Sequence, residues 1–227
     1  MSSSEQVKVH VMRHGEVQNP QRIVYGRLPH YHLSELGQQM VRLSAERFAQ
    51  MQAEGANLVY LAVSPLTRTR ESAEPITELT GLQAHPDERV IEAANYFEGL
   101  HVNHAELTGN PQHWPKLINP LRPSWGEPYK EQAARMAEAI KDAGAQALAL
   151  GGSRAEAIIV SHQLPIWMAR RSAEGKFLPH DPRTRQCNLA SITTFEFADL
   201  LSGERPRISY QEPAAPLYSG VIQLPGT

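Results

Sequence analysis

Two arginines and two histidines have the types and positions needed to move a phosphoryl group. Arg13 and His14 are adjacent, Arg68 follows downstream, and His162 comes later still. Phosphoryl transfer needs a nucleophile in line with phosphorus, positive charge on the equatorial oxygens and a proton for the leaving oxygen. An imidazole is a suitable nucleophile because its ordinary pKa of about 6.5 leaves much of it unprotonated at neutral pH. His14 therefore fits the role of phosphoryl acceptor.

Other residues of suitable chemistry meet the remaining requirements. The guanidinium groups of Arg13 and Arg68 present forked donors that match phosphate oxygens. His162 can form a hydrogen bond to a further oxygen. Glu92 is the natural proton donor if burial or a bound phosphate raises its pKa. Gly15 would let the backbone turn tightly beside the nucleophile.

Predicted strands place these residues at comparable positions in a fold. Short apolar runs predict a first strand at residues 8–12 and buried strands at 58–63 and 157–160, and residues 89–91 fit a brief strand. Helical spacing, with Ser34 as an N-cap and Gly81 as a stop, predicts helices at 34–55, 64–80, 129–150 and from about Pro165 onward. Two further strands are predicted at 192–197 and 208–210.

The alternation of strands and helices predicts an α/β fold with a mainly parallel, doubly wound sheet and helices on both faces. In such sheets, ligands bind outside the carboxyl ends of the strands. That edge is where the chain places the two arginines, the two histidines and Glu92. Residues 99–128 lack periodicity and are rich in proline, so we expect a lid-like insertion there.

Composition limits the class of protein. The length of 227 residues predicts one domain over residues 1–227. The single cysteine, Cys187, excludes a disulfide scaffold. A formal net charge of −2 gives no global basic field that would favour nucleic acid or an anionic membrane. No run approaches the roughly 18 apolar residues of a membrane helix. The polar residues 1–6 do not resemble a signal peptide, so we expect a cytoplasmic protein.

Three blocks of sequence, in their order and spacing, resemble the signature of the histidine phosphatase superfamily, which includes the cofactor-dependent phosphoglycerate mutases. These blocks are Arg13-His14-Gly15-Glu16, Ser64-Pro65-Leu66-Thr67-Arg68 and Val160-Ser161-His162. Three further segments are similar to family motifs: Gly26 with Leu33-Ser34-Glu35-Leu36-Gly37-Gln38-Gln39, Glu92 with Glu98-Gly99, and Gly126-Glu127-Pro128 with Arg135. The resemblance spans roughly residues 7 to 197.

The resemblance implies a three-layer α/β/α sandwich and a phosphohistidine intermediate on His14. It implies that Arg13, Arg68 and His162 bind the phosphate and that Glu92 is the proton donor. It implies neither a metal nor another cofactor. It also implies that the partner of the protein is a small phosphorylated metabolite.

The chain departs from the family pattern around the substrate. Pro20 stands where the first block commonly has Asn, and we expect Asn19, one residue earlier, to reach the phosphate instead. The following loop lacks the usual Asp and is one residue longer. We expect Tyr25 and Gly26 of this loop to bind substrate, and we expect the loop and the insertion together to select among substrates.

Two groups of side chains allow more than one interpretation. Four histidines suggest a metal site, but their spacing suits no zinc pattern and no cysteine lies close to them. They are His30, His32, His101 and His104. Four aromatic residues either line a lid over the substrate or pack the insertion onto the body of the protein. They are Tyr96, Phe97, Trp114 and Trp125.

The acceptor of the phosphoryl group decides the reaction. A second hydroxyl of the substrate would make the protein a cofactor-dependent phosphoglycerate mutase, but mutases of this family use an Arg-rich segment after the proton donor. Residues 99–121 contain only Lys116 as a fixed positive charge, which favours water as the acceptor and a metal-independent phosphomonoester hydrolase. A non-catalytic phospholigand-binding module would have lost His14, Glu92 or His162, and the sequence keeps all three.

Overall fold

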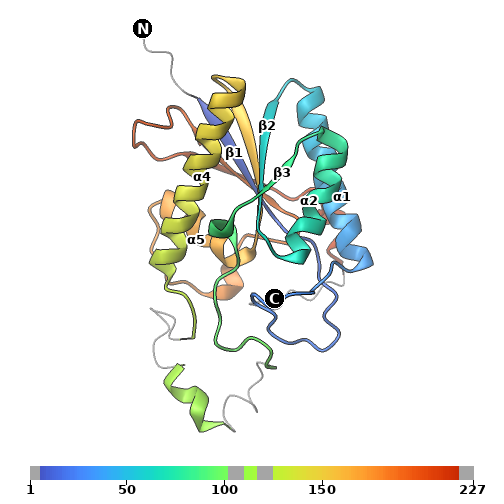
Figure 1. The fold of residues 1–227 in the computed structure, drawn as a ribbon. Helices are drawn as coiled ribbons and strands as arrows, with labels where there is room; N and C mark the ends of the chain where they lie inside the picture. The colour runs from blue at the N-terminus through green and yellow to red at the C-terminus, as the bar shows by residue number, and fades with distance from the viewer. Residues whose placement is uncertain (1–5, 102–109, 117–124, 220–227) are drawn as a thin grey trace.

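A six-stranded sheet forms the centre of the protein (Figure 1). The computed structural model describes residues 6–101, 110–116 and 125–219. The described strands are β1 Val7–Arg13, β2 Asn57–Val63, β3 Ala84–Pro86, β4 Ala155–Ser161, β5 Ile192–Phe197 and β6 Arg207–Gln211. Their order across the sheet is β3-β2-β4-β1-β5-β6. The first four are parallel to one another, whereas β5 and β6 are antiparallel at one edge.

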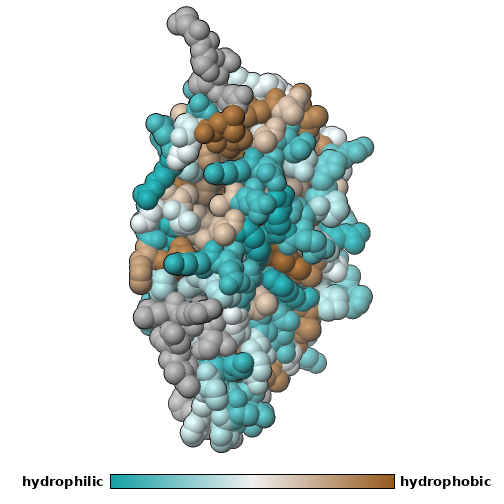
Figure 2. All heavy atoms as spheres, turned by 60° about the vertical axis from the view of Figure 1, so that its left-hand side comes forward, coloured by the Kyte–Doolittle hydropathy of each residue, from teal (hydrophilic) through white to brown (hydrophobic). Residues whose placement is uncertain are grey.

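Helices cover both faces of this sheet and complete three layers (Figure 1). On one face lie α1 (Glu35–Ala53) and α2 (Thr67–Thr80), which share a hydrophobic core with the sheet. On the other lie α4 (Tyr129–Gly151) and α5 (Gln163–Ala173), which pack over a second core. Hydrophilic side chains cover most of the middle of the face seen in Figure 2. The predicted three-layer α/β/α fold with a mainly parallel sheet is confirmed.

Strand β1 contributes side chains to both hydrophobic cores. Successive side chains of a strand point to opposite faces. Val9 and Val11 are buried in the core beneath α4, whereas Met12 belongs to the core beneath α1 and α2. His10, on the same face as Met12, contacts the ring of Phe48 in α1 at a centroid distance of 5.9 Å. A strand buried on both faces reads as a nearly continuous apolar run, which is why the sequence revealed it.

The ends of the helices follow local chemistry. The Ser34 hydroxyl accepts a hydrogen bond from the Gly37 N–H at 2.9 Å and caps α1, as predicted. Gly81 ends α2 in the left-handed conformation, with φ of +77°, which glycine adopts without a Cβ clash. Pro165 lies in the first turn of α5, where its missing N–H leaves no intrahelical hydrogen bond unmade.

The register of the parallel strands brings their carboxyl ends level. Val63 of β2 lies beside Val160 of β4, and Arg13 of β1 lies beside Ser161 of β4. The residues that directly follow these strands therefore emerge side by side at one edge of the sheet. His14 donates its backbone N–H to the Ser161 carbonyl at 3.1 Å, which continues this pairing beyond the end of β1.

The predicted strand at residues 89–91 is wrong. Residues Glu88–Val90 form a 3₁₀ helix, because Asp87 accepts a hydrogen bond from the Arg89 N–H at 2.8 Å and turns the chain. The edge strand of this region is β3, Ala84–Pro86, whose three residues are all exposed. An exposed edge strand of three residues that ends in proline carries no apolar pattern, so it cannot be recognised from the sequence.

The predicted insertion lies beyond the carboxyl ends of the strands in Figure 1, as far as it is described. Its described middle part is a 3₁₀ helix, Pro111–Lys116. The buried His113 of this helix contacts the rings of Tyr96 and Phe97 at centroid distances of 5.7 and 5.6 Å. His104 and much of the insertion fall outside the described residues, and its role as a lid stays a prediction. Within the described chain, no helix has the length and apolar character needed to cross a membrane.

Candidate active site

His14 and His162 meet at the edge where β1 and β4 end. The matched register of the two strands sets their rings 5.2 Å apart, in an edge-to-face arrangement. Both side chains are buried, at 1% and 0% exposure. The two histidines are 148 positions apart in the sequence but adjacent in the fold, as expected from the strand-end argument.

The two ring nitrogens of His14 differ, because Nδ1 is held by a hydrogen bond and Nε2 can act as the nucleophile. Nδ1 lies 2.7 Å from the Gly15 carbonyl oxygen, which can only accept, so Nδ1 carries the proton and Nε2 presents a lone pair. Burial, followed by the positive charges of Arg68 and Arg13, lowers the pKa of His14 well below its ordinary value. The imidazole is therefore neutral at neutral pH, which is the form a nucleophile needs.

Arg13 and Arg68 are both buried, each with only 1% of its surface exposed. Arg13 donates from Nη1 to the Cys187 carbonyl at 2.9 Å. Arg68 donates from Nη2 to the Gly26 carbonyl at 2.7 Å, and burial lowers its pKa. Its Nε has no hydrogen-bond partner among the described residues. Two buried guanidinium groups, one with an unmatched donor, form a strong local site for an anion in a protein of net negative charge.

Both ring nitrogens of His162 already have partners. Nδ1 accepts from Arg68 Nη2 at 3.1 Å, and Nε2 lies 2.7 Å from the Ser64 hydroxyl. Burial, with Arg68 as the next cause, lowers the pKa of His162 well below its ordinary value. A hydrogen bond from His162 to a phosphate oxygen therefore requires the exchange of its contact with Arg68.

Glu92 lies beside this cluster, on the loop that follows the 3₁₀ helix Glu88–Val90. Its carboxylate accepts a hydrogen bond from the Ala93 N–H at 2.8 Å. Burial raises its pKa, and this effect exceeds the opposing pull of the Ala93 N–H and of the nearby Arg68. A raised pKa favours the protonated carboxyl, the form that can donate a proton.

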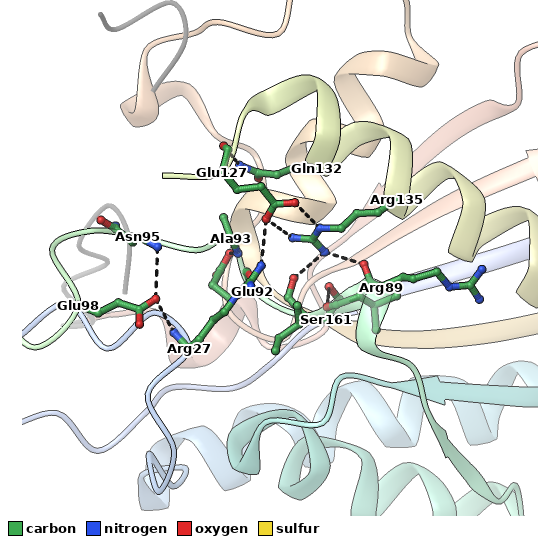
Figure 3. A network of polar contacts seen from close by, with 12 residues as sticks. Arg27, Arg89, Glu92, Ala93, Asn95, Glu98, Glu127, Gln132, Arg135 and Ser161 are labelled. Carbon is green, nitrogen blue, oxygen red and sulfur yellow. Dashed lines mark hydrogen bonds and ion pairs between the residues drawn. The ribbon is translucent and has the colours of Figure 1, made fainter. Parts of the chain in front are cut away.

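Two arginines hold the main chain around Glu92 (Figure 3). Arg135 donates from Nη1 to the carbonyls of Arg89 and Ile91, at 2.6 and 2.8 Å. Arg27 donates from Nε to the carbonyl of Glu92 itself at 2.7 Å. We call these two side chains, with the carboxylate that joins them, the Glu92 clamp.

Glu127 is the carboxylate that joins the two arginines of the Glu92 clamp (Figure 3). It accepts from Arg135 Nε and Nη2 at 2.7 and 2.9 Å, and from Arg27 Nη2 at 3.1 Å. A planar carboxylate that receives two donors from one guanidinium has a well-defined orientation. The clamp therefore holds the main chain at three points, the carbonyls of Arg89, Ile91 and Glu92.

The comparisons with known proteins match this geometry to a family. The family model described as "Histidine phosphatase superfamily (branch 1)" matches residues 9–201. The chain belongs to the histidine phosphatase superfamily. An uncharacterised Mycobacterium tuberculosis protein, Rv0525, is 42% identical over 213 residues, which cover 93% of this chain and 98% of that protein.

Solved structures of phosphatases share the fold. The mycobacterial glucosyl-3-phosphoglycerate phosphatase Rv2419c superposes with a TM-score of 0.72 at 22% identity, covering 91% of this chain and 99% of that one. A phosphoserine phosphatase of Entamoeba histolytica, in complex with 3-phosphoglyceric acid, has a TM-score of 0.68 at 21% identity, covering 90% and 96%. At such identities the likeness shows a common architecture.

The loop after β1 needs glycine at position 15 for a reason other than the predicted tight turn. Gly15 has no positive φ, and a Cβ built on it would lie 2.5 Å from the Gly37 carbonyl oxygen. A Cβ on Gly37 would in turn lie 2.1 Å from the Glu16 carbonyl oxygen. The two glycines let the loop after β1 pack directly against the first turn of α1.

The predicted substrate-binding residues lie in different settings. Gly26 supplies the carbonyl bound by Arg68, and the buried Tyr25 packs its ring 4.9 Å from the Arg68 guanidinium carbon. Asn19 bonds both ends of its amide to the backbone of Ile23, at 2.9 and 3.2 Å. The contact between Asn19 and a phosphate stays a prediction.

The aromatic residues predicted for the lid divide into two kinds. Phe97 and Trp125 line a cavity beside Glu92, whereas Tyr96 and Trp114 are exposed at 45% and 55%. The metal alternative gains no support, because no group of three or more His, Cys, Asp or Glu suited to a metal ion occurs in the described part of the chain.

Sequence reasoning missed the residues that position the others. Ser64 touches His162, and the Ser72 hydroxyl accepts a hydrogen bond from the Gly15 N–H at 3.2 Å. Arg27 lies in the loop after Gly26, and no motif in the sequence singles it out. Ser64 and Glu127 stood inside family-like blocks, and that was the one signal available for them.

Proposed function

We propose that this chain is a metal-independent phosphomonoester hydrolase that works through a phosphohistidine on His14. The observation that carries the proposal is the state of that ring. Nδ1 is held by the Gly15 carbonyl, which leaves Nε2 as the nucleophile, and burial keeps the imidazole neutral. Arg13 and Arg68 lie close enough to act on the same ring by their charge, as a phosphoryl group on His14 would require.

The first half of the reaction forms the phosphoenzyme. His14 Nε2 attacks phosphorus, and the bond between phosphorus and the ester oxygen breaks. Arg13 and Arg68 stabilise the charge on the equatorial oxygens. Glu92, with its raised pKa, gives its proton to the departing oxygen, so that an alcohol leaves.

The second half returns the enzyme to its starting state. Water attacks the phosphoryl group, the bond between phosphorus and Nε2 of His14 breaks, and inorganic phosphate leaves. The Glu92 carboxylate, now deprotonated, takes the proton from the attacking water and is ready to act as an acid again. His162 supplies a further hydrogen bond to phosphate once Nδ1 has exchanged Arg68 for a phosphate oxygen and carries the ring proton, with Nε2 then accepting from the Ser64 hydroxyl.

The substrates we propose are small phosphorylated metabolites. The structural neighbours described as glucosyl-3-phosphoglycerate phosphatase and phosphoserine phosphatase support this class by their names. Water is the proposed acceptor because Lys116 is the lone fixed positive charge between residues 99 and 121. Lys116 also lies 5.0 Å over the ring of Tyr96, so its charge faces an aromatic surface.

The test is turnover of an aryl phosphate in the presence of a chelator, with and without His14→Ala. We expect release of phosphate from the unaltered protein and an acid-labile phosphoenzyme in rapid-quench samples. Both should be absent from His14→Ala. Retained turnover in that variant would refute His14 as the acceptor, and loss of activity on chelation would refute metal independence.

The same preparation separates hydrolysis from the two other functions. A mutase would interconvert phosphoglycerates faster than it releases phosphate, which would overturn the choice of water as acceptor. A phospholigand-binding module would bind inorganic phosphate without turnover of any ester. The control is Arg42→Met, on the exposed side of α1, which should leave phosphate release unchanged.

A further inference from the structure

A cavity of about 220 Å³ opens beside Glu92. Glu92 forms part of its wall, and the aromatic side chains of Phe97, Trp125 and Tyr129 form another part. The volume corresponds to about seven water molecules of the liquid, which is enough for the carbon frame of a small alcohol. If Glu92 protonates the leaving oxygen, the alcohol attached to that oxygen occupies this cavity.

Arg185 is the one cation among the described residues that line the cavity. Its Nε donates to His180 Nε2 at 2.9 Å, and its Nη1 donates to the Gln163 side-chain oxygen at 3.2 Å. Neither partner is an anion, and no described carboxylate forms an ion pair with Arg185. Its Nη2 has no hydrogen-bond partner among the described residues and is not enclosed.

His180 orients Arg185 without neutralising it. Nδ1 of His180 donates to the Leu178 carbonyl at 2.8 Å, so Nε2 carries the lone pair that accepts from Arg185. Burial lowers the pKa of His180 to about 4, and the ring is neutral near pH 7. Burial also lowers the pKa of Arg185, and this effect exceeds the opposing effects of the nearby Tyr129 and Glu92.

Gln163 ties Arg185 to the phosphate end of the site. Its side-chain N–H lies 3.5 Å from the Cys187 carbonyl, the same carbonyl that accepts from Arg13. This fixes which end of the Gln163 amide faces Arg185. The guanidinium is therefore held in place before any ligand arrives, which lowers the entropic cost of binding.

The other charges in the cavity wall are already matched. Glu127 is bound by Arg135 and Arg27 in the Glu92 clamp, and Glu92 is protonated when it acts as the acid. The unmatched charge is the positive one of Arg185. A ligand with a negative group at the far end of its alcohol would supply the missing counterion.

We propose that the cavity binds the alcohol part of a phosphorylated hydroxy acid, and that Arg185 binds its carboxylate. This rests on the proposed function and deepens it, because it assigns the class of alcohol. A second phosphate fits less well, since a dianion calls for more than one cation and the described lining offers only Arg185. The substrates are then phosphate monoesters that carry a carboxylate a few bonds from the ester oxygen.

The test compares carboxylates with neutral carboxamides of the same shape. Phosphate monoesters of ω-hydroxy acids with two, three and four carbons are each measured against their own carboxamide. For the best chain length we expect kcat/KM to favour the acid by about 10- to 100-fold, the usual value of a charged hydrogen-bonding partner. In Arg185→Gln the ratio of acid to amide should fall to near one, and Arg185→Lys should give an intermediate ratio.

Arg183→Gln is the matched control, because Arg183 is two residues away, exposed, and paired with Asp181 instead of lining the cavity. It should keep the full preference for the acid. A ratio near one in the unaltered protein, or one that survives Arg185→Gln, overturns the assignment of Arg185. A stronger preference for a bisphosphate of the same length overturns the carboxylate.

A binding measurement separates failure of this subsite from failure of the proposed function. His14→Ala is titrated with non-hydrolysable phosphonate analogues of the same pairs while tryptophan fluorescence is followed, since Trp125 lines the cavity. Tighter binding of the acids supports the subsite even if hydrolysis does not depend on His14. Equal binding of acid and amide overturns the subsite while leaving His14-dependent hydrolysis intact.

Discussion

Arg135→Met removes the guanidinium that holds the main chain before Glu92 while keeping a long, flexible side chain in its place. Two donations are lost, to the Arg89 carbonyl at 2.6 Å and to the Ile91 carbonyl at 2.8 Å. Glu127 loses the two that it receives from the same side chain and keeps one from Arg27. Of the contacts between the clamp and the main chain, only the one from Arg27 to the Glu92 carbonyl then remains.

The size of the effect follows from what Glu92 contributes. Hydrogen bonds to charged groups are each worth about 1.5–3 kcal/mol, so the two lost carbonyl contacts release a restraint of roughly 3–6 kcal/mol. A displacement of about 1 Å in a reacting group can cost about 10²-fold in rate. General acid catalysis as a whole supplies about 10²–10⁴-fold. We therefore expect kcat on alkyl phosphates to fall by about 10²-fold.

The assay measures kcat/KM for phosphate esters whose alcohols span a wide range of pKa. Alkyl alcohols need a proton as they leave, whereas phenols with a low pKa leave without one. The loss in Arg135→Met should grow steadily with the pKa of the alcohol and be less than about 10-fold for nitrophenyl phosphate. The basic limb of the pH profile should also move to higher pH. Arg135 lowers the pKa of Glu92, and this pKa should rise when Arg135 is removed.

An equal loss on aryl and alkyl esters would refute the reasoning, because it would show general damage to the site. Arg89→Met serves as the control for stability. Its side chain forms ion pairs with Asp87 and Asp142, and only its backbone carbonyl contacts the Glu92 clamp, through Arg135. Arg89→Met should lower Tm without changing how kcat/KM depends on the pKa of the leaving alcohol. The two variants are compared at temperatures equally far below their own Tm.

Three further outcomes are expected. The acid limb of kcat/KM should lie below pH 6.5, because burial and two arginines lower the pKa of His14; a limb above 6.5 would contradict this, and a pH–rate profile measures it. Gly15→Ala should lower the free energy of unfolding by about 1–3 kcal/mol, since its Cβ would meet the Gly37 carbonyl at 2.5 Å; unchanged urea denaturation would count against that contact. Glu156 has a pKa held low by its hydrogen bond to His10, so its stabilising contribution is complete above its unfolded value of 4.5 and is lost as pH falls through the lower folded value. Glu156→Gln should therefore flatten the acid side of a plot of urea midpoint against pH, and an unchanged slope would refute the assignment.

The sequence brought Arg13, His14, Arg68 and His162 together because each lies at or shortly after the end of a strand with a recognisable pattern. Buried runs such as residues 58–63 read as parallel strands, and the rule for strand ends then brings their following residues together. Glu92 was found beside an element that proved to be a 3₁₀ helix, so its place came from the family resemblance more than from the pattern. Local capping signals such as Ser34 and Gly81 were also legible, because the partner lies within a few residues.

The sequence could not predict how the side chains of the site are held in place, because most of their hydrogen-bond acceptors are main-chain carbonyls. The carbonyl of Gly15 orients His14, that of Gly26 holds Arg68, and that of Cys187 holds Arg13. A carbonyl is present at every position, so the residue type at that position leaves no trace of the contact. Cys187 shows the same separation between side chain and backbone. Arg13 binds its backbone carbonyl, whereas its thiol is buried and burial raises the pKa of that thiol, as in a cysteine that packs in a core.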